Sequence, residues 1–411
     1  MDRTWEKVVE GYREELLAMA RAGLESVYWR QDRYPTGGIV ESDERVDGGR
    51  KLYWPWCWPR THIVEPLIAV GQFHRVERFL DFWIECQRPD GNWLHCYDVR
   101  DHREYPGWPE TDNVGYMLWH FGAYVKAAGD EQWLGRNWSH IESAARFLEE
   151  NYRPEICLIW GQEEANLPGR ASHSIRYSLH INCVCALGLL SAGDLAERRG
   201  DTTAAHRWRE MAESILDEGI AVRLWDAEKR TFAWGLGEDG KRLTAPGLWM
   251  TLMPFWLFDR FDGRLDDTLA YLRTCLYDRD PKIPKTYWFY DFSPVLDAGK
   301  ELVNQYSGYG VAIGGLPVLA HALVKADQGE HAREQLEKIV EHTSKDNGLI
   351  PDHVNTLTPG KIGDYSIYPE GQYRVDSGNL LHLSFFLTLT ARHEPGVLRR
   401  ASEEAMGGTD I

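Results

Sequence analysis

Several segments of this 411-residue chain place acidic side chains close to aromatic ones. In LIWGQEEAN, Trp160 is followed within a few residues by the adjacent carboxylates Glu163 and Glu164. Two neighbouring carboxyl groups suit general acid–base catalysis, because their mutual repulsion can keep one of them protonated. The alternative is a solvated acidic loop in which the tryptophan only packs.

Two other segments supply side chains that could bind a polar ring. YWPWCWPR contains Trp58 and Arg60, and GWPETDN contains Trp108 and Asp112. Indole faces stack on the flat C–H faces of sugar rings, while Arg and Asp can hydrogen-bond vicinal hydroxyls. For Trp58 the alternative is loop packing, and Asp112 could instead cap a helix that begins at Asn113.

A second carboxylate for the same site is expected near the C-terminus. GLIPDH contains Asp352 and YPEGQYR contains Glu370, and both motifs fall in one long link. Either side chain could reach the site. Tyr290 and Asp291, in TYWFYDF, are weaker candidates.

Helices must position these segments, because apolar residues recur at three- and four-residue spacing and alternation is scarce. The spacing predicts helices near 4–22, 61–72, 73–88, 113–128, 131–152, 174–199, 202–222, 245–257, 263–277, 304–324, 328–344 and 377–392. Short Gly-Asp junctions, such as those at 129–130 and 200–201, join helices into pairs. The long links are 23–60, 89–112, 153–173, 223–244, 278–303 and 345–376. This alternation predicts an all-α (α/α)6 barrel, a single domain over residues 1–411, with the long loops at one end.

Composition excludes several functional classes. The formal net charge of −17 argues against a nucleic-acid partner. The N-terminus has no apolar signal core and no stretch approaches the ~20 apolar residues of a membrane span, so we expect a cytoplasmic protein with no membrane contact. Seven scattered cysteines favour neither a disulfide framework nor a zinc site, and no HExxH motif is present. The 18 Trp, 19 Tyr and 13 Phe favour carbohydrate binding over core packing alone. The oligomeric state is not specified by any of these features.

The motifs named above resemble those of glycoside hydrolase family 15, the glucoamylase, glucodextranase and bacterial trehalase group. PTGGIVES and GGRKLYWPWCWPR look like the family's opening region, and ETDNVGYMLW is similar to its second. PEICLIWGQEEAN is similar to the region ending in Trp-Glu-Glu, and GLIPDHV to the Ile-Pro-Glu-Gln-Val of bacterial members. The four motifs keep the family's order over nearly the whole chain.

The resemblance implies the same (α/α)6 barrel and inverting hydrolysis of an α-glycosidic bond in an oligosaccharide or small glycoside, with no cofactor or catalytic metal. It implies that Glu163 is the general acid and that Glu164 contacts the sugar. The base is Asp352 by alignment, although Glu370 has the usual side-chain length.

Three departures from the family motifs affect the site. Arg60 is followed by Thr61 where the family has Asp, Gly161 and Gln162 separate Trp160 from the acid, and Asp352 replaces a Glu.

Two other functions remain open. A sugar isomerase or epimerase on the same barrel would use His180 and His382 as acid and base, although both could be ordinary core histidines. A non-catalytic sugar-binding protein would account for the three departures.

Overall fold

The computed structural model of the chain describes residues 3–41, 43–46, 49–52, 56–104, 110–161, 175–244, 249–277, 310–343, 348–350, 353–355 and 379–407. These residues form two compact units. Unit 1 takes its described residues from Met1–Arg33, Val40–Pro55 and Ala245–Ile411, and unit 2 from Tyr34–Ile39 and Trp56–Thr244. The single domain stays a prediction.

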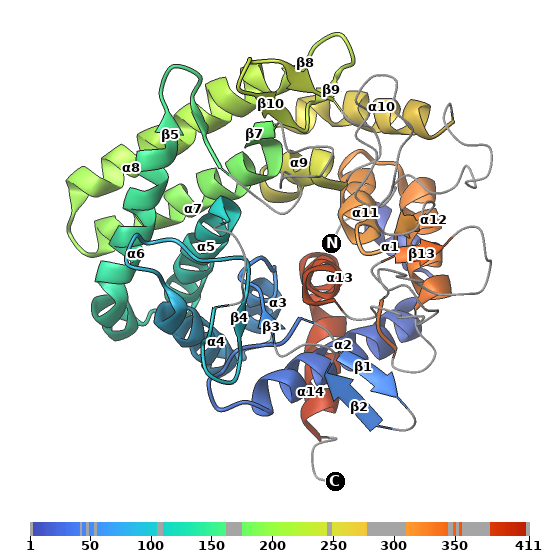
Figure 1. Cartoon of the computed structure of the whole chain (residues 1–411). Helices are drawn as coiled ribbons and strands as arrows, with labels where there is room; N and C mark the ends of the chain where they lie inside the picture. Colours follow the sequence, from blue (N-terminus) through green and yellow to red (C-terminus); the bar gives the residue numbers. More distant parts are fainter. Residues whose placement is uncertain are drawn as a thin grey trace, which may run out of the picture. The chain divides into compact units, whose positions relative to one another are not determined.

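Unit 2 is built from consecutive helices that pack on their neighbours (Figure 1). Its helices are α3 (Val64–Ala69), α4 (Phe73–Cys86), α5 (Thr111–Ala128), α6 (Glu131–Asn151), α7 (Leu179–Arg198), α8 (Thr202–Ser214) and the π-helical η2 (Ile215–Arg223). Its short strands are β3 (Trp56–Cys57), β4 (Tyr97–Asp98), β5 (Tyr152–Arg153), β6 (Leu158–Ile159), β7 (Ile175–Ser178), β8 (Trp225–Asp226), β9 (Thr231–Phe232), β10 (Gly235–Gly237) and β11 (Arg242–Leu243).

The predicted Gly-Asp junctions end one helix and begin the next. Gly129 adopts φ +67° after α5, and Gly200 adopts φ +79° after α7, a conformation that favours glycine. The following side chains cap the next helices, because Asp130 accepts a hydrogen bond from the Trp133 amide and Asp201 accepts one from the Ala204 amide. These caps fix α5–α6 and α7–α8 as helical hairpins, as the sequence predicted.

Two glycines let α5 and α7 approach unusually closely. A Cβ on Gly115 would lie 2.7 Å from the backbone nitrogen of Cys185, and one on Gly188 would lie 2.6 Å from the Gly115 carbonyl oxygen. No side chain fits at either position. The amino-terminal turns of both helices, which carry the polar residues described below, are therefore held against one another.

Unit 1 is also mainly helical (Figure 1). Its helices are α1 (Arg3–Val8), α2 (Arg13–Asp32), η3 (Trp249–Leu252), α9 (Met253–Leu257), η4 (Asp262–Arg264), α10 (Leu265–Tyr277), α11 (Leu316–Lys325), α12 (Gly329–His342), α13 (Leu380–His393) and α14 (Pro395–Gly407). Two antiparallel pairs complete it, β1 (Asp43–Val46) with β2 (Gly49–Leu52) and β12 (Gly310–Ala312) with β13 (His353–Asn355). Helix α2 packs against α13 and α14, and α11 packs against α12.

Several predicted helix boundaries were wrong. The first helix is interrupted at Gly11, whose φ is +86°, and α2 then runs ten residues beyond the predicted end. Residues 175–178 form strand β7, which pairs with β10, because backbone pairing outweighs the helical pattern there. Residues 310–312 are likewise extended in β12, and helix α14 was not predicted.

Helix α7 corrects one reading of the sequence. Among the described helices it has the length and the mean hydropathy, 1.5, to cross a membrane, and 78% of that stretch is buried. It packs against α5 and α8 within unit 2. A buried core helix meets the same criteria of length and composition.

Candidate functional site

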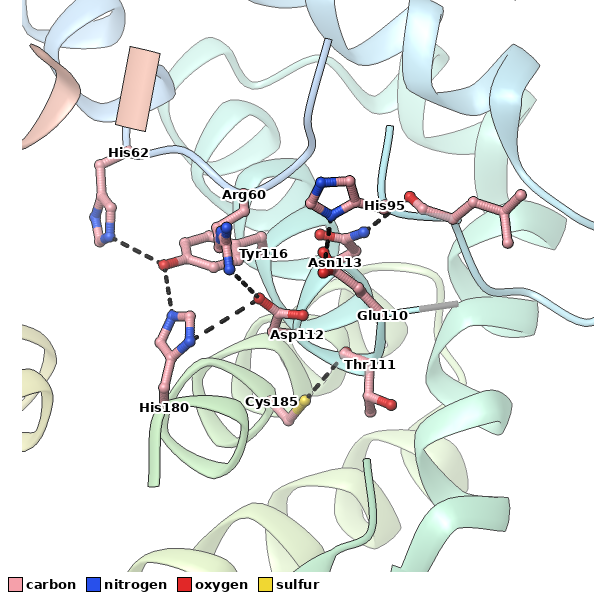
Figure 2. Close-up of polar contacts among 11 residues, drawn as sticks. Arg60, His62, His95, Glu110, Thr111, Asp112, Asn113, Tyr116, His180 and Cys185 are labelled. Carbon is pink, nitrogen blue, oxygen red and sulfur yellow. Dashed lines mark hydrogen bonds and ion pairs between the residues drawn. The ribbon is translucent and has the colours of Figure 1, made fainter. Parts of the chain in front are cut away.

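The first turn of α5 places a buried carboxylate beside a buried guanidinium. Asp112 is the second residue of the helix, and its Oδ2 lies 3.9 Å from Nη1 of Arg60 (Figure 2). Asp112 has no exposed surface and Arg60 is 3% exposed. The helix begins at Thr111, so Asp112 lies inside its first turn rather than at the cap before Asn113. A negative charge is favourable there because it opposes the helix dipole.

Asp112 also faces a chain of buried aromatic polar groups. Its Oδ2 lies 3.9 Å from Nδ1 of His180, the second residue of α7. The Tyr116 hydroxyl lies 3.0 Å from Nε2 of His180 and 3.4 Å from Nε2 of His62 (Figure 2). Asp112 and Tyr116 share one face of α5, because they are four residues apart. The structure thus brings Arg60 and Asp112, two predicted binding residues, together with three that the motifs did not identify as binding residues.

A second buried contact, between a carboxylate and a histidine, lies beside the neighbouring tryptophan. Glu110, the residue before α5, has its Oε1 2.8 Å from Nδ1 of His95, and both side chains are almost fully buried. The ring of Trp58 lies 4.9 Å from that of His95 and 5.9 Å from the Arg60 guanidinium carbon. Glu110 and Asp112 therefore each hold a basic side chain that contacts Trp58.

The departure at Thr61 has a local explanation. Thr61 is fully buried, and its Oγ1 accepts a hydrogen bond from the Ile63 amide at the start of α3. The hydroxyl therefore closes a turn. The position where the family carries an acid is here used in local backbone structure.

The departure at Gly161 follows from close packing. A Cβ at this position would lie 2.7 Å from the Cβ of Thr111, at the start of α5. The Gly161 amide donates to the Arg176 carbonyl in β7, and the preceding Trp160 is 36% exposed. The glycine thus allows the segment after β6 to pass against the helix that carries Asp112, and it leaves Trp160 accessible.

The surroundings of the cluster are poorly solvated. Burial lowers the pKa of His120, on α5, to about 3, and burial raises the pKa of the Cys183 thiol, on α7, well above its usual value. Charges in such a setting interact more strongly than they do in water. Among the described residues, no group of three or more His, Cys, Asp or Glu side chains could hold a metal ion.

The predicted catalytic carboxylates Glu163, Asp352 and Glu370 lie outside the described residues, as do the predicted binding residues Glu164 and Trp108 and the weaker candidates Tyr290 and Asp291. Their roles stay predictions. His382, considered above as an alternative acid or base, is buried in unit 1, where a Cβ on Gly314 would lie 2.2 Å from its Cγ.

Sequence reasoning missed His62, Tyr116, His95 and Glu110. Some signals were present, because Glu110 stands inside GWPETDN and His62 is two residues after Arg60. The spacing of Asp112 and Tyr116 also predicts a shared helix face. None of these signals identifies which side chain from another element each residue contacts.

Comparison with known proteins finds no matching family model. The chain is 33% identical over 238 residues to an uncharacterized glycosyl hydrolase of Methanocaldococcus jannaschii, a match that covers 56% of this chain. The chain spans about a third, 35%, of the length of that relative.

Solved structures resemble the chain over most of its length. A glycosidase variant in complex with glucose has a TM-score of 0.62 at 16% identity, covering 94% of this chain and 98% of that one. A bacterial glucoamylase complexed with acarbose has a TM-score of 0.59 at 14% identity, covering 90% and 55%. A sugar epimerase from a ruminal bacterium has a TM-score of 0.56 at 11% identity, covering 92% and 99%. These likenesses show the fold class that the sequence predicted, an all-α (α/α)6 barrel of the kind found in glycosidases.

Proposed function

We propose that the chain is an inverting, exo-acting glycoside hydrolase. It would remove a terminal sugar from an oligosaccharide by cleaving an α-glucosidic bond, as family 15 members do. The observation that carries the proposal is the buried pair of Arg60 and Asp112 beside Trp58. Burying such a pair costs desolvation energy that mutual attraction alone does not reliably offset. A guanidinium, a carboxylate and an indole face together offer the donor, acceptor and stacking surface that a sugar requires.

The comparisons support hydrolysis at a coarser level. The Methanocaldococcus jannaschii relative is described as a glycosyl hydrolase, and two of the similar structures hold glucose or acarbose. The epimerase shares the same fold, so the choice of reaction depends on the site residues.

In the proposed mechanism Glu163 donates a proton to the leaving oxygen, and a second carboxylate activates water on the opposite face of the sugar. An inverting enzyme separates these groups by roughly 6.5–9.5 Å to admit the water. The second carboxylate is Asp352 or Glu370. Glu164, Trp108 and Trp160 complete the sugar-binding set in this proposal.

The contacts of His180 argue against the epimerase alternative. Its Nε2 lies 3.0 Å from the Tyr116 hydroxyl and its Nδ1 faces Asp112, so both ring nitrogens already face protein groups. A general acid or base must reach a proton on the substrate. His180 is better suited to hold other groups in place.

The first test compares Glu163→Gln with Glu164→Gln, two identical changes at adjacent positions. We expect Glu163→Gln to lose roughly 10²–10⁴ in turnover of an α-glucoside, because it removes the general acid while keeping its shape. Glu164→Gln should mainly raise KM. NMR should show that the released sugar first has the β configuration. Epimerisation of a free sugar by the wild type without hydrolysis would favour the isomerase, and binding without any reaction would favour a sugar-binding protein.

The second test identifies the base. Azide should restore turnover to either Asp352→Gly or Glu370→Gly, with inverted product, because only one of them holds the attacking water. The other variant should show a raised KM and no rescue. If neither substitution lowers activity, the hydrolase proposal is wrong.

A further inference from the structure

Four buried side chains form a continuous line from His62 to Asp112 (Figure 2). The Tyr116 hydroxyl lies between the Nε2 atoms of His62 and His180, at 3.4 Å and 3.0 Å, and Nδ1 of His180 faces Asp112 at 3.9 Å. All four side chains have no exposed surface. The groups come from α5, α7 and the segment before α3, so tertiary packing brings them together.

The carboxylate at one end sets the direction of the hydrogen bonds. A carboxylate facing Nδ1 of a neutral histidine favours the tautomer with its proton on Nδ1. Nε2 of His180 is then an acceptor, so the Tyr116 hydroxyl donates to it. Tyrosine has one hydroxyl proton, and its oxygen therefore accepts from Nε2–H of His62.

We propose that His62, Tyr116 and His180 are positioning residues that form a one-way relay of two hydrogen bonds, which ends with Nδ1–H of His180 facing the Asp112 carboxylate across 3.9 Å. The relay presents an N–H to the Asp112 carboxylate from the side of α7, while Arg60 approaches the same Oδ2. The carboxylate is held between two basic groups and keeps one orientation toward the sugar. The role of this relay in sugar binding rests on the proposed function, whereas the predicted histidine tautomers do not depend on it.

The packing of the two helices supports a fixed geometry. Gly115 and Gly188 bring α5 and α7 into backbone contact, so Tyr116 and His180 cannot separate without breaking that contact. The ring of Trp119 lies edge-on to His62 at 5.0 Å and restricts its rotation. A relay needs donors and acceptors that stay aligned, and these contacts provide that alignment.

Histidine ¹⁵N NMR of the whole wild-type chain tests the tautomers without any activity measurement. His62 and His180 are assigned by loss of their signals in His62→Gln and His180→Gln. We expect the tautomer with the proton of His180 on Nδ1 and that of His62 on Nε2. The opposite tautomer at His180 overturns the proposal.

Tyr116→Phe tests whether the relay matters for the sugar. It should raise KM for an α-glucoside roughly tenfold, the effect of losing one hydrogen bond that supports a charged group, and change kcat less than about threefold. Tyr124→Phe is the matched control, because its hydroxyl donates to Asp130 at the other end of α5. Equal KM in Tyr116→Phe and the wild type overturns the positioning role.

His180 offers a replacement that preserves one half of the relay. In His180→Asn the side-chain amide can replace Nδ1–H and keep the contact with Asp112. In His180→Gln the longer side chain can replace only Nε2, which contacts Tyr116. We expect His180→Asn to keep KM within about threefold of the wild type and His180→Gln to lose roughly tenfold. The reverse order overturns the proposed direction. If the wild type does not hydrolyse glycosides, the NMR result still decides the relay, and only the proposed function fails.

Discussion

Each unit packs histidines against other side chains, but the partners of these histidines differ. In unit 2, the Arg60 cluster joins a carboxylate, a guanidinium, a phenol and two imidazoles; its members are Arg60, His62, Asp112, Tyr116 and His180. In unit 1, the His321 cluster joins two imidazoles to two indoles and a guanidinium; its members are Trp5, Trp256, His321, Arg392 and His393.

The His321 cluster consists mainly of packing contacts between aromatic rings. Nδ1 of His321 lies 2.9 Å from Nε2 of His393, Trp5 stacks on His393 at 4.5 Å, and Trp256 meets His321 edge-on at 5.1 Å. Burial, followed by the positive charge of Arg392, holds the pKa of His321 well below its usual value. His321, with aromatic and cationic neighbours, stays neutral and fills space.

The Arg60 cluster instead contains opposite charges at the start of a helix, next to a segment that carries an exposed tryptophan. Histidine burial alone therefore does not identify a site. The charge of the partner separates the two cases, and substitutions can measure that difference.

The largest difference should appear between the two arginines. Arg60→Ala removes the guanidinium from a buried carboxylate, and we expect a loss of about 3 kcal/mol in the free energy of unfolding. Arg392→Ala loses a cation–π contact at 4.3 Å and a hydrogen bond to the Trp256 carbonyl, worth about 1–2 kcal/mol together. Urea unfolding of both variants measures this, and equal losses would remove the distinction between the clusters.

The next largest effect should come from a steric clash at Gly161. Gly161→Ala should lower the free energy of unfolding by about 1–3 kcal/mol, because the new Cβ would collide with Thr111 next to the Arg60 cluster. Gly263→Ala, in unit 1, is the control, since nothing lies within 4 Å of the place its methyl group would take and no loss is expected. A tolerated Gly161→Ala would mean that the start of α5 moves easily.

The pH dependence of stability tests the neutral state of His321. Its native pKa lies below the ordinary value of about 6.5, so only the unfolded chain takes up this proton as the pH falls. The contribution of His321 to the free energy of unfolding is fully present above about pH 6.5. It declines below that pH and is about 1.4 kcal/mol smaller at about pH 5.5. His321→Gln should lose less stability than the wild type between pH 7 and pH 5.5, as measured by urea unfolding. If His321→Gln and the wild type lost the same stability between pH 7 and pH 5.5, His321 would take up its proton without unfolding.

The sequence predicted the fold through local signals. The Gly-Asp junctions at 129–130 and 200–201 act within a few residues, and they correctly defined two helical hairpins. Strand β7 was missed because its partner β10 lies far along the chain, beyond α7, α8 and η2, and such pairing leaves no local pattern.

The site was predictable only in part, for the same reason. Arg60 and Asp112 were chosen by residue type, and the structure brings them together. The role of Tyr116 depends on His62 and His180, which reach it through tertiary packing, and neither side chain type nor helical spacing indicates that contact.

The smallest stability effect is expected at Trp160, which is 36% exposed beside Gly161. Trp160→Ala should lower the free energy of unfolding by about 1 kcal/mol, because the indole is only partly removed from water. Met406→Ala, at a 44% exposed position in unit 1, should have a similarly small effect. The two variants should differ in sugar binding: Trp160→Ala should weaken the affinity for a glucoside several-fold by removing a stacking face, while Met406→Ala should leave it unchanged. Calorimetric titration measures this, and unchanged affinity in Trp160→Ala would exclude the exposed indole from the proposed sugar site while leaving the Arg60 cluster as its remaining support.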